Sequence, residues 1–215
     1  AIASLTKLMT AYVVYKHGDL EDQWAIDTGS THDVRPLLGL TVGDKVQVKD
    51  LVNSMLIGSA NDAAAAIGAY LTNKTNVPAH ELMNKEARNL KMTDTHFENP
   101  IGFDSEQNYS TASDLLLLIR EISDINLFTS LELEQSYSFV GTLGKTYSVK
   151  ATNTLIGNDP ELRAIKTGFT DEAGGAMITA VEHDGRRYIM IVLGSRDREA
   201  DTKLLKSNLL NALGN

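Results

Sequence analysis

The sequence predicts an α+β fold, in which a helical block packs against an antiparallel sheet and a final helix closes the domain. Two observations lead to this prediction. Stretches with apolar residues at helical spacing fill most of the chain up to residue 122, whereas β-rich stretches separated by glycine turns dominate from residue 137. Helices and strands therefore occur in separate blocks, and do not alternate as they do in a parallel β–α–β protein.

The first helix is predicted over residues 4–17. Its apolar side chains recur at helical spacing, which indicates one buried face; they are Leu5, Leu8, Met9, Tyr12 and Val13. Ser4 has a side chain suited to capping the N-terminus, and Gly18 marks the expected end. Residues 25–50 carry several glycines and no sustained period, so we expect a loop with short strands there.

Four more helices complete the predicted helical block, over residues 50–57, 63–71, 79–91 and 112–122. Asp50 is expected to cap the first of these, and Thr111 with Asp114 forms a capping box before the last. Residues 93–109 contain Asn99-Pro100 and Gly102, which indicate a loop.

The last third of the chain is predicted to be mainly strands. Tyr137–Val140 and Thr146–Val149 form a short hairpin, and a further strand covers Arg163–Thr170. The stretches 175–182 and 186–193 flank Asp184-Gly185, a strong signal for a tight hairpin turn. A closing helix is expected over residues 199–213, with Leu204, Leu205, Leu209 and Leu210 on one side.

Composition excludes several classes of protein. The 215 residues are 42% hydrophobic and 22% charged, which is ordinary for a folded globular chain. The net charge of −8 argues against binding to nucleic acid, whose phosphates an acidic surface repels. Cysteine is absent, and the five histidines show no metal-binding spacing, so we expect no metal and no cofactor.

Three short motifs could carry chemistry, and the first is Ser4-x-x-Lys7. Residues three apart on a helix are neighbours on one face. A serine hydroxyl becomes a good nucleophile when a base removes its proton, and lysine can be that base if burial or a nearby cation lowers its pKa. Taken alone, the pair is also consistent with a capping serine beside a surface lysine.

The second motif, Ser59-x-Asn61, lies on a glycine-led loop before an alanine-rich helix. Ser59 could relay a proton and Asn61 could bind a substrate amide, although both could equally serve as ordinary helix caps. The third, Lys166-Thr167-Gly168, lies in a strand-like stretch. Lys166 could lower the pKa of Lys7, Thr167 could bind a carboxylate, and Gly168 leaves room for a ligand backbone.

The ordered trio resembles the signature of the penicillin-recognising serine enzymes, which comprise penicillin-binding proteins and serine β-lactamases. Longer segments resemble the low-molecular-weight D-alanyl-D-alanine carboxypeptidases in particular; they are Ala3–Thr10, Ile57–Ala64, Thr95–Gly102, Tyr109–Asp114 and Ile165–Thr170. The resemblance extends over nearly the whole chain. It implies a β-lactamase-like catalytic domain spanning residues 1–215, without the β-rich second domain and membrane anchor of many relatives.

The resemblance also implies a role for each motif residue. Ser4 would attack the carbonyl between two D-alanines, with Lys7 as general base and Ser59 passing a proton to the leaving group. Asn61 would hold the substrate amide, and the segment Lys166–Phe169 would complete the site. Within that segment, Lys166 and Thr167 would bind the terminal carboxylate and Gly168 would admit the substrate. The backbone N–H groups of Ser4 and Phe169 would form the oxyanion hole.

Some positions depart from the family pattern. Phe169 replaces a frequent histidine, and Thr152 stands where some members carry an arginine, so Arg163 becomes a further candidate for carboxylate binding. Only three residues precede Ser4, whereas the family has two sheet strands there. We therefore expect a fragment that lacks these N-terminal strands. Arg196–Glu199 is interpreted as a charged surface stretch.

The expected substrate is a peptidoglycan stem peptide ending in D-Ala-D-Ala, and β-lactams are expected to acylate Ser4. Action outside the cytoplasm follows, after export by a signal peptide that this chain does not contain. A D,D-endopeptidase, a serine β-lactamase and a non-catalytic peptidoglycan-binding module remain alternatives. The β-lactamase alternative is weakened because no Glu-x-x-x-Asn follows the second motif.

Overall fold

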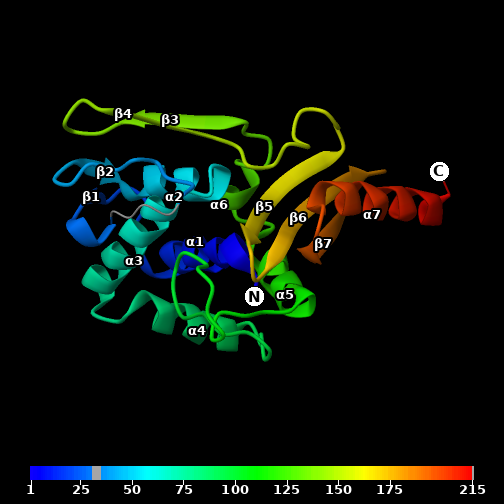
Figure 1. Cartoon of the computed structure of the whole chain (residues 1–215), viewed down its shortest axis with the longest axis horizontal. Helices are drawn as coiled ribbons and strands as arrows, with labels where there is room; N and C mark the ends of the chain where they lie inside the picture. Colours follow the sequence, from blue (N-terminus) through cyan, green and yellow to red (C-terminus); the bar gives the residue numbers. More distant parts are fainter. Residues whose placement is uncertain (31–34, 215) are drawn as a thin grey trace.

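Three antiparallel strands form a sheet in the C-terminal part of the chain, in the order β5–β6–β7 (Figure 1). They span Leu162–Thr170, Gly174–His183 and Arg186–Ser195. The last helix, α7 (Arg198–Leu213), packs against β6 and β7, whereas the N-terminal 3₁₀ turn η1 (Ala3–Leu5) contacts β5 and β6. Among the described residues β5 pairs with one strand only, so its second edge is open beside η1.

Most of the helical block lies on the other side of β5, whereas α5 (Ala112–Ile122) contacts β7 (Figure 1). The structure, a computed structural model, describes residues 1–30 and 35–214. The remaining helices are α1 (Thr6–His17), η2 (Thr28–Ser30), α2 (Val48–Ile57), α3 (Asn61–Thr75), α4 (Ala79–Asn89), α5 (Ala112–Ile122) and α6 (Asn126–Thr129). Within the described ranges, no helix is both long and apolar enough to cross a lipid bilayer.

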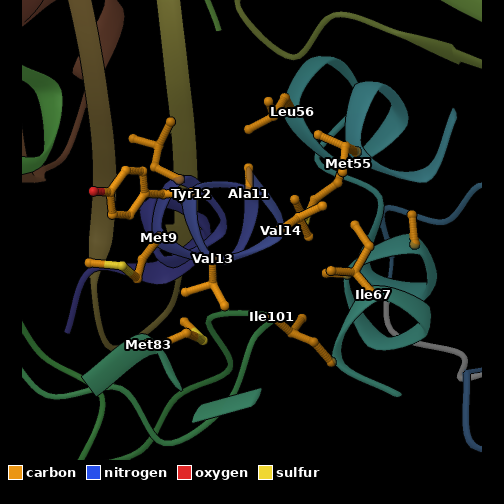
Figure 2. Close-up of a cluster of buried hydrophobic side chains, with 14 of the residues drawn as sticks. Met9, Ala11, Tyr12, Val13, Val14, Met55, Leu56, Ile67, Met83 and Ile101 are labelled. Carbon is orange, nitrogen blue, oxygen red and sulfur yellow. The ribbon is translucent and has the colours of Figure 1, made fainter. Parts of the chain in front are cut away.

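Helix α1 forms the centre of the hydrophobic core (Figure 2). The sequence predicted one buried face, but the structure buries every residue from Thr6 to Val14. The helix packs between α2, α3 and α4, with Met55, Ile67 and Met83 among its neighbours in Figure 2. A helix enclosed on all sides holds its polar side chains away from water, and this determines the chemistry of Lys7.

Two small antiparallel hairpin-like pairs lie beside the helices. Strand β1 (Gln23–Ala25) pairs with β2 (Lys45–Gln47), and β3 (Ser136–Val140) pairs with β4 (Thr146–Lys150). The buried Asp44 connects the two pairs, because its carboxylate accepts hydrogen bonds from the Tyr147 hydroxyl and from the β3–β4 turn. The β3–β4 pair confirms the predicted short hairpin.

Several predicted helix starts are corrected by the structure. Ser4 does not cap α1, because its hydroxyl accepts a hydrogen bond from Lys7 instead. Asp50 does not cap α2, which begins two residues earlier; its carboxylate accepts from the Tyr137 hydroxyl. Thr111 does cap α5, but Asp114 accepts from the Asp94 backbone N–H and from Thr95, so the reciprocal half of the capping box is absent there.

The predicted sheet is confirmed with small changes at the strand ends. Asp184 and Gly185 have φ angles of 48° and 69°, as a type I′ turn requires at both central residues. Helix α7 is present, but Leu204 and Leu205 on its predicted apolar side remain exposed. The helix instead buries Thr202, whose hydroxyl donates to the sulfur of Met177 in β6.

Candidate active site

The first motif places a serine and a lysine in direct contact. Ser4 lies in η1 and Lys7 in the first turn of α1, so the three-residue spacing puts both side chains on one face. Lys7 Nζ donates a hydrogen bond to Ser4 Oγ over 2.8 Å. The serine hydroxyl and the lysine nitrogen are thus within proton-transfer reach without any rearrangement.

Lys7 is fully buried, and its side-chain nitrogen has three hydrogen-bond acceptors. Its ammonium nitrogen also donates to Asn61 Oδ1 over 2.8 Å and to the backbone oxygen of Ile101 over 2.5 Å. Burial first, and the positive charge of Lys166 second, hold the pKa of Lys7 well below its ordinary value. A lysine with a lowered pKa can be neutral near physiological pH, which is the state that accepts the proton of Ser4.

The loop before α5 fixes the third acceptor of Lys7. Asn99 Oδ1 accepts hydrogen bonds from the backbone N–H groups of Ile101, Gly102 and Phe103, at 2.7 to 3.1 Å. Gly102 has a φ of +90°, and a Cβ atom there would lie 2.1 Å from the oxygen of Ala3. Only glycine therefore lets this loop approach the nucleophile closely enough for Ile101 to accept from Lys7.

The second motif forms the turn between α2 and α3. Asn61 begins α3 and points its oxygen at Lys7, while Ser59, two residues earlier, is 4% exposed with a φ of +57°. A non-glycine residue with positive φ is uncommon and indicates that the surrounding contacts determine the turn. The structure brings Asn61 into contact with Lys7, which also contacts Ser4, and Ser59 lies in the same buried turn.

Asp62 holds a second loop against this turn. Its carboxylate, 2% exposed, accepts from the backbone N–H groups of Leu38, Gly39 and Leu40 at 2.7 to 3.1 Å. The backbone N–H of Asn61 in turn donates to the Pro36 oxygen over 2.8 Å. Asp62 was not among the site residues predicted from the sequence, because its partners lie 22 to 24 residues away in the chain.

The third motif lies on β5, opposite the serine. Lys166 and Thr167 are 2% and 3% exposed, and Phe169 extends into solvent with 64% of its surface exposed. A Cβ atom on Gly168 would lie 3.0 Å from the backbone nitrogen of Ser4, so the missing side chain brings the two walls together. Burial first, and the charge of Arg198 second, lower the pKa of Lys166 to about 7.

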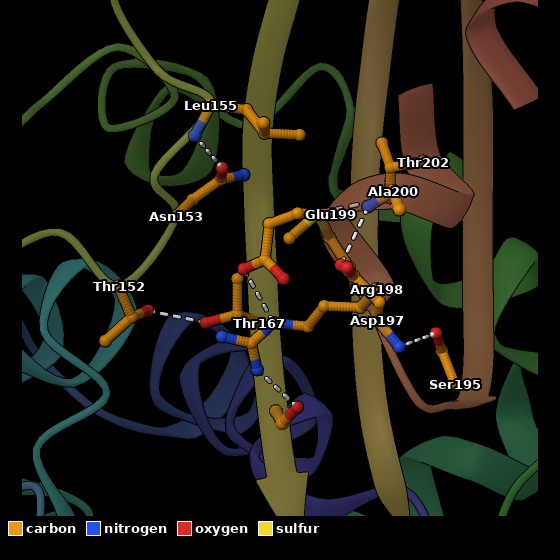
Figure 3. Close-up of polar contacts among 12 residues, drawn as sticks. Thr152, Asn153, Leu155, Thr167, Ser195, Asp197, Arg198, Glu199, Ala200 and Thr202 are labelled. Atoms are coloured by element: carbon orange, nitrogen blue, oxygen red, sulfur yellow. Dashed lines mark hydrogen bonds and ion pairs between the residues drawn. The ribbon is translucent and has the colours of Figure 1, made fainter. Parts of the chain in front are cut away.

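Arg198 is the main residue that the sequence analysis missed (Figure 3). It was interpreted as part of a charged surface stretch, but its guanidinium donates to the oxygen of Gly168 over 2.7 Å. Gly175 leaves room for Arg198 in this position. A Cβ atom on residue 175 would lie only 3.2 Å from the Cβ atom of Arg198 and would crowd it. Arg163, the arginine proposed from the sequence, donates to the backbone oxygens of Pro160 and Leu162 instead.

Thr152 also reaches the third motif. Its hydroxyl lies 2.5 Å from that of Thr167. Figure 3 draws this hydrogen bond as a dashed line. Both residues line a cavity of about 40 Å³, together with Asn153, whose Nδ2 has no hydrogen-bond partner in the described structure. A cavity of this size has room for about two or three water molecules, and Asn153 is a polar group that could bind one. Thr152 thus extends the polar wall around Thr167.

Metal ligands do not gather at this site. Over residues 1–30 and 35–214, no three His, Asp or Glu side chains are arranged to hold an ion. His32 lies outside the described residues.

Comparisons with known proteins identify the family. The family described as D-alanyl-D-alanine carboxypeptidase matches residues 1–197, and the chain belongs to this family. The chain is 32% identical to the D-alanyl-D-alanine carboxypeptidase DacD of Escherichia coli and 28% identical to DacF of Bacillus subtilis. These matches cover 94% and 95% of this chain but 55% of each relative, so the chain spans about half the length of the curated relatives it matches.

Solved structures of the same fold are also similar. The crystal structure of a Streptomyces DD-transpeptidase superposes with a TM-score of 0.84 at 27% identity, over 94% of this chain and 84% of that one. A penicillin-binding protein of Listeria monocytogenes, solved with ampicillin bound, gives a TM-score of 0.80 at 32% identity, over 96% and 85%. These likenesses confirm the predicted α+β fold of the D,D-peptidases.

Proposed function

We propose that the protein is a serine D-alanyl-D-alanine carboxypeptidase that removes the terminal D-alanine from peptidoglycan stem peptides. The observation that carries the proposal is the buried contact between Lys7 Nζ and Ser4 Oγ, at 2.8 Å, in a lysine whose pKa is held low. Family membership supports the substrate class, since the relatives are named for this activity. Residues 1–215 act in this proposal as one catalytic domain.

The first half of the reaction forms an acyl-enzyme. Ser4 Oγ attacks the carbonyl carbon of the penultimate D-alanine, while neutral Lys7 takes the hydroxyl proton. The backbone N–H groups of Ser4 and Phe169 stabilise the negative oxygen of the tetrahedral intermediate. The C–N bond then breaks, and Ser59 passes a proton to the departing amine and takes the proton of Lys7 in its place, which leaves Lys7 neutral. Asn61 holds the amide of the substrate during these steps.

The second half returns the enzyme to its starting state. A water molecule attacks the ester on Ser4 and Lys7 accepts its proton. Lys7 then returns this proton to Ser4 Oγ as the ester bond breaks, and the shortened peptide leaves with a new carboxylate. The terminal carboxylate of the substrate binds to Lys166 and Thr167. Arg198 adds a second positive charge at this end, because it already lies beside Gly168 of the same strand. An extended peptide on the open edge of β5 satisfies this geometry.

Partners and place of action follow from this substrate. The protein acts outside the cytoplasmic membrane, where peptidoglycan lies, and β-lactams acylate Ser4 because they mimic the D-Ala-D-Ala end. The relative solved with ampicillin bound supports this part of the proposal.

Intact mass after incubation with benzylpenicillin tests the proposal, together with D-alanine release from a D-Ala-D-Ala peptide. We expect one lasting penicillin adduct and free D-alanine, and we expect Ser4→Ala to lose both. Rapid hydrolysis of penicillin without an adduct would indicate a β-lactamase. Cleavage of cross-linked peptides in preference to free ends would indicate an endopeptidase, and peptide binding without any release would indicate a non-catalytic module.

A further inference from the structure

The segment that follows β4 contacts both the helical block and the sheet. The backbone N–H of Thr152 donates to the oxygen of Ile57, the last residue of α2, over 3.2 Å. The backbone N–H of Ala151 donates to the oxygen of Gln135 over 2.8 Å. The Thr152 side chain reaches Thr167 on β5 (Figure 3). Thr152 therefore has a fixed place between the second and the third motif.

The backbone of Thr167 is also held in place. Thr167 lies within β5 and pairs with Met177 of β6, and its backbone oxygen accepts from Lys166 Nζ over 3.0 Å. Its side chain is buried, so water is a poor substitute for a protein partner of its hydroxyl. What the backbone leaves free is the direction of that hydroxyl, and Thr152 is the group that lies against it.

The direction of the hydrogen bond between the two hydroxyls follows from the proposed function. A hydroxyl has one proton to donate and can also accept on its oxygen. The terminal carboxylate of the substrate only accepts, so Thr167 has to donate its one proton to the substrate. The Thr152 hydroxyl, 2.5 Å away, then has to donate to Thr167 Oγ1. A hydroxyl that accepts one hydrogen bond is held in direction and donates the other more strongly.

We propose that Thr152 is a positioning residue, which turns the hydroxyl of Thr167 toward the terminal carboxylate of the substrate. The proposal rests on the proposed function, because it uses the carboxylate-binding role assigned there to Thr167. Thr152 acts through Thr167 and takes no part in bond breaking. It should therefore influence how tightly the substrate carboxylate binds, and leave the reaction between Ser4 and Lys7 unchanged.

Two substitutions at residue 152 test this proposal with the peptide Nα,Nε-diacetyl-L-Lys-D-Ala-D-Ala. Thr152→Val keeps the shape of the side chain but removes the hydroxyl, whereas Thr152→Ser keeps the hydroxyl. We expect Thr152→Val to raise KM for D-alanine release by about 3- to 10-fold, the value of one neutral hydrogen bond, with kcat unchanged. Thr152→Ser should retain the wild-type KM. Thr154→Val, exposed on the same segment, is the matched control and should change neither constant.

A double-mutant cycle separates positioning from direct contact with the substrate. Benzylpenicillin also carries a carboxylate, and its acylation rate at low concentration is measured by intact mass for the wild type, both single Val variants and the double variant. We expect Thr152→Val to slow acylation by about 3- to 10-fold when Thr167 is present. In the Thr167→Val background it should cost nothing further, because the group that Thr152 positions is gone.

An equal loss from Thr152→Val with and without Thr167 would overturn the proposal, because Thr152 would then bind the carboxylate itself. So would wild-type behaviour of Thr152→Val, or a loss in kcat with KM unchanged. A Thr152→Ser variant as weak as Thr152→Val would also overturn it, by assigning the effect to packing of the segment. These outcomes differ from failure of the proposed function, in which the wild type neither releases D-alanine nor forms a penicillin adduct.

Discussion

The two walls of the candidate site differ in how their cations are bonded. On the helical wall, Lys7 Nζ donates to three acceptors, which are Ser4 Oγ, Asn61 Oδ1 and the Ile101 oxygen. On the sheet wall, the described acceptor of Lys166 Nζ is the backbone oxygen of its own neighbour, Thr167. Both lysines are buried, and burial lowers the pKa of each. Both lysines thus lose their contact with water, but only Lys7 regains several hydrogen bonds from the protein.

This difference indicates a division of labour between the walls. A lysine nitrogen with three fixed partners is held in one position. In its neutral form it donates to two of them and can receive the proton of the third, Ser4. A buried lysine with few protein partners favours an incoming anion, because a carboxylate would supply the missing interactions. In this interpretation the helical wall performs the chemistry, and the sheet wall binds the end of the substrate.

The largest expected effect comes from the helical wall, where a substitution removes the proposed base. Lys7→Met keeps the length of the side chain but leaves no nitrogen to accept the Ser4 proton. Loss of a general base typically lowers a rate by about 10²- to 10⁴-fold, and we expect the acylation rate with benzylpenicillin to fall in that range. Lys16→Met, on the same helix but exposed, is the control and should acylate normally. Unchanged acylation of Lys7→Met would remove Lys7 from the mechanism.

The next largest effect concerns the sheet wall. Arg198→Leu removes a charged donor, and we expect kcat/KM for a D-Ala-D-Ala peptide to fall by roughly 10- to 100-fold, mainly through KM. Arg198 is the second cause, after burial, of the low pKa of Lys166.

The pH profile of Arg198→Leu sharpens this prediction. Lys166 binds a carboxylate in its protonated form, so in the wild type binding weakens as pH rises through its pKa of about 7. Without the charge of Arg198 this pKa rises, and the alkaline limb of kcat/KM should move to higher pH. A limb that stays in place would contradict electrostatic coupling between the two residues.

A stability measurement tests how rigidly the helical wall is assembled. Gly102→Ala combines a positive φ with a Cβ atom 2.1 Å from the Ala3 oxygen, so we expect a loss of about 2 to 4 kcal/mol in the free energy of unfolding. Gly43→Ala has a similar φ of +85° but nothing within 4 Å, and should lose only about 1 kcal/mol. Chemical denaturation measures both, and equal losses would show that the close approach to Ala3 carries no energy.

Local features of the fold could be predicted well from the sequence. The turn at Asp184-Gly185 and the cap of Thr111 on α5 depend on contacts between residues that are near in the chain, and both are confirmed. Motif recognition also found Ser4, Lys7 and Asn61, which the structure places in contact. By contrast, the expected caps at Ser4 and Asp50 are wrong, because tertiary partners use those side chains instead.

The sequence by itself thus determined the order of the elements, the three motifs and the family. Only the tertiary structure decided that Arg198 belongs to the site, because its position depends on two strand registers. Phe169 of β5 pairs with Gly175 of β6, and Gly175 pairs with Ser195 at the end of β7. Helix α7 begins three residues after Ser195, so Arg198 lies close to the end of β5. It likewise decided the protonation chemistry of Lys7, because desolvation depends on everything packed around α1 and not on the residues beside it in the chain.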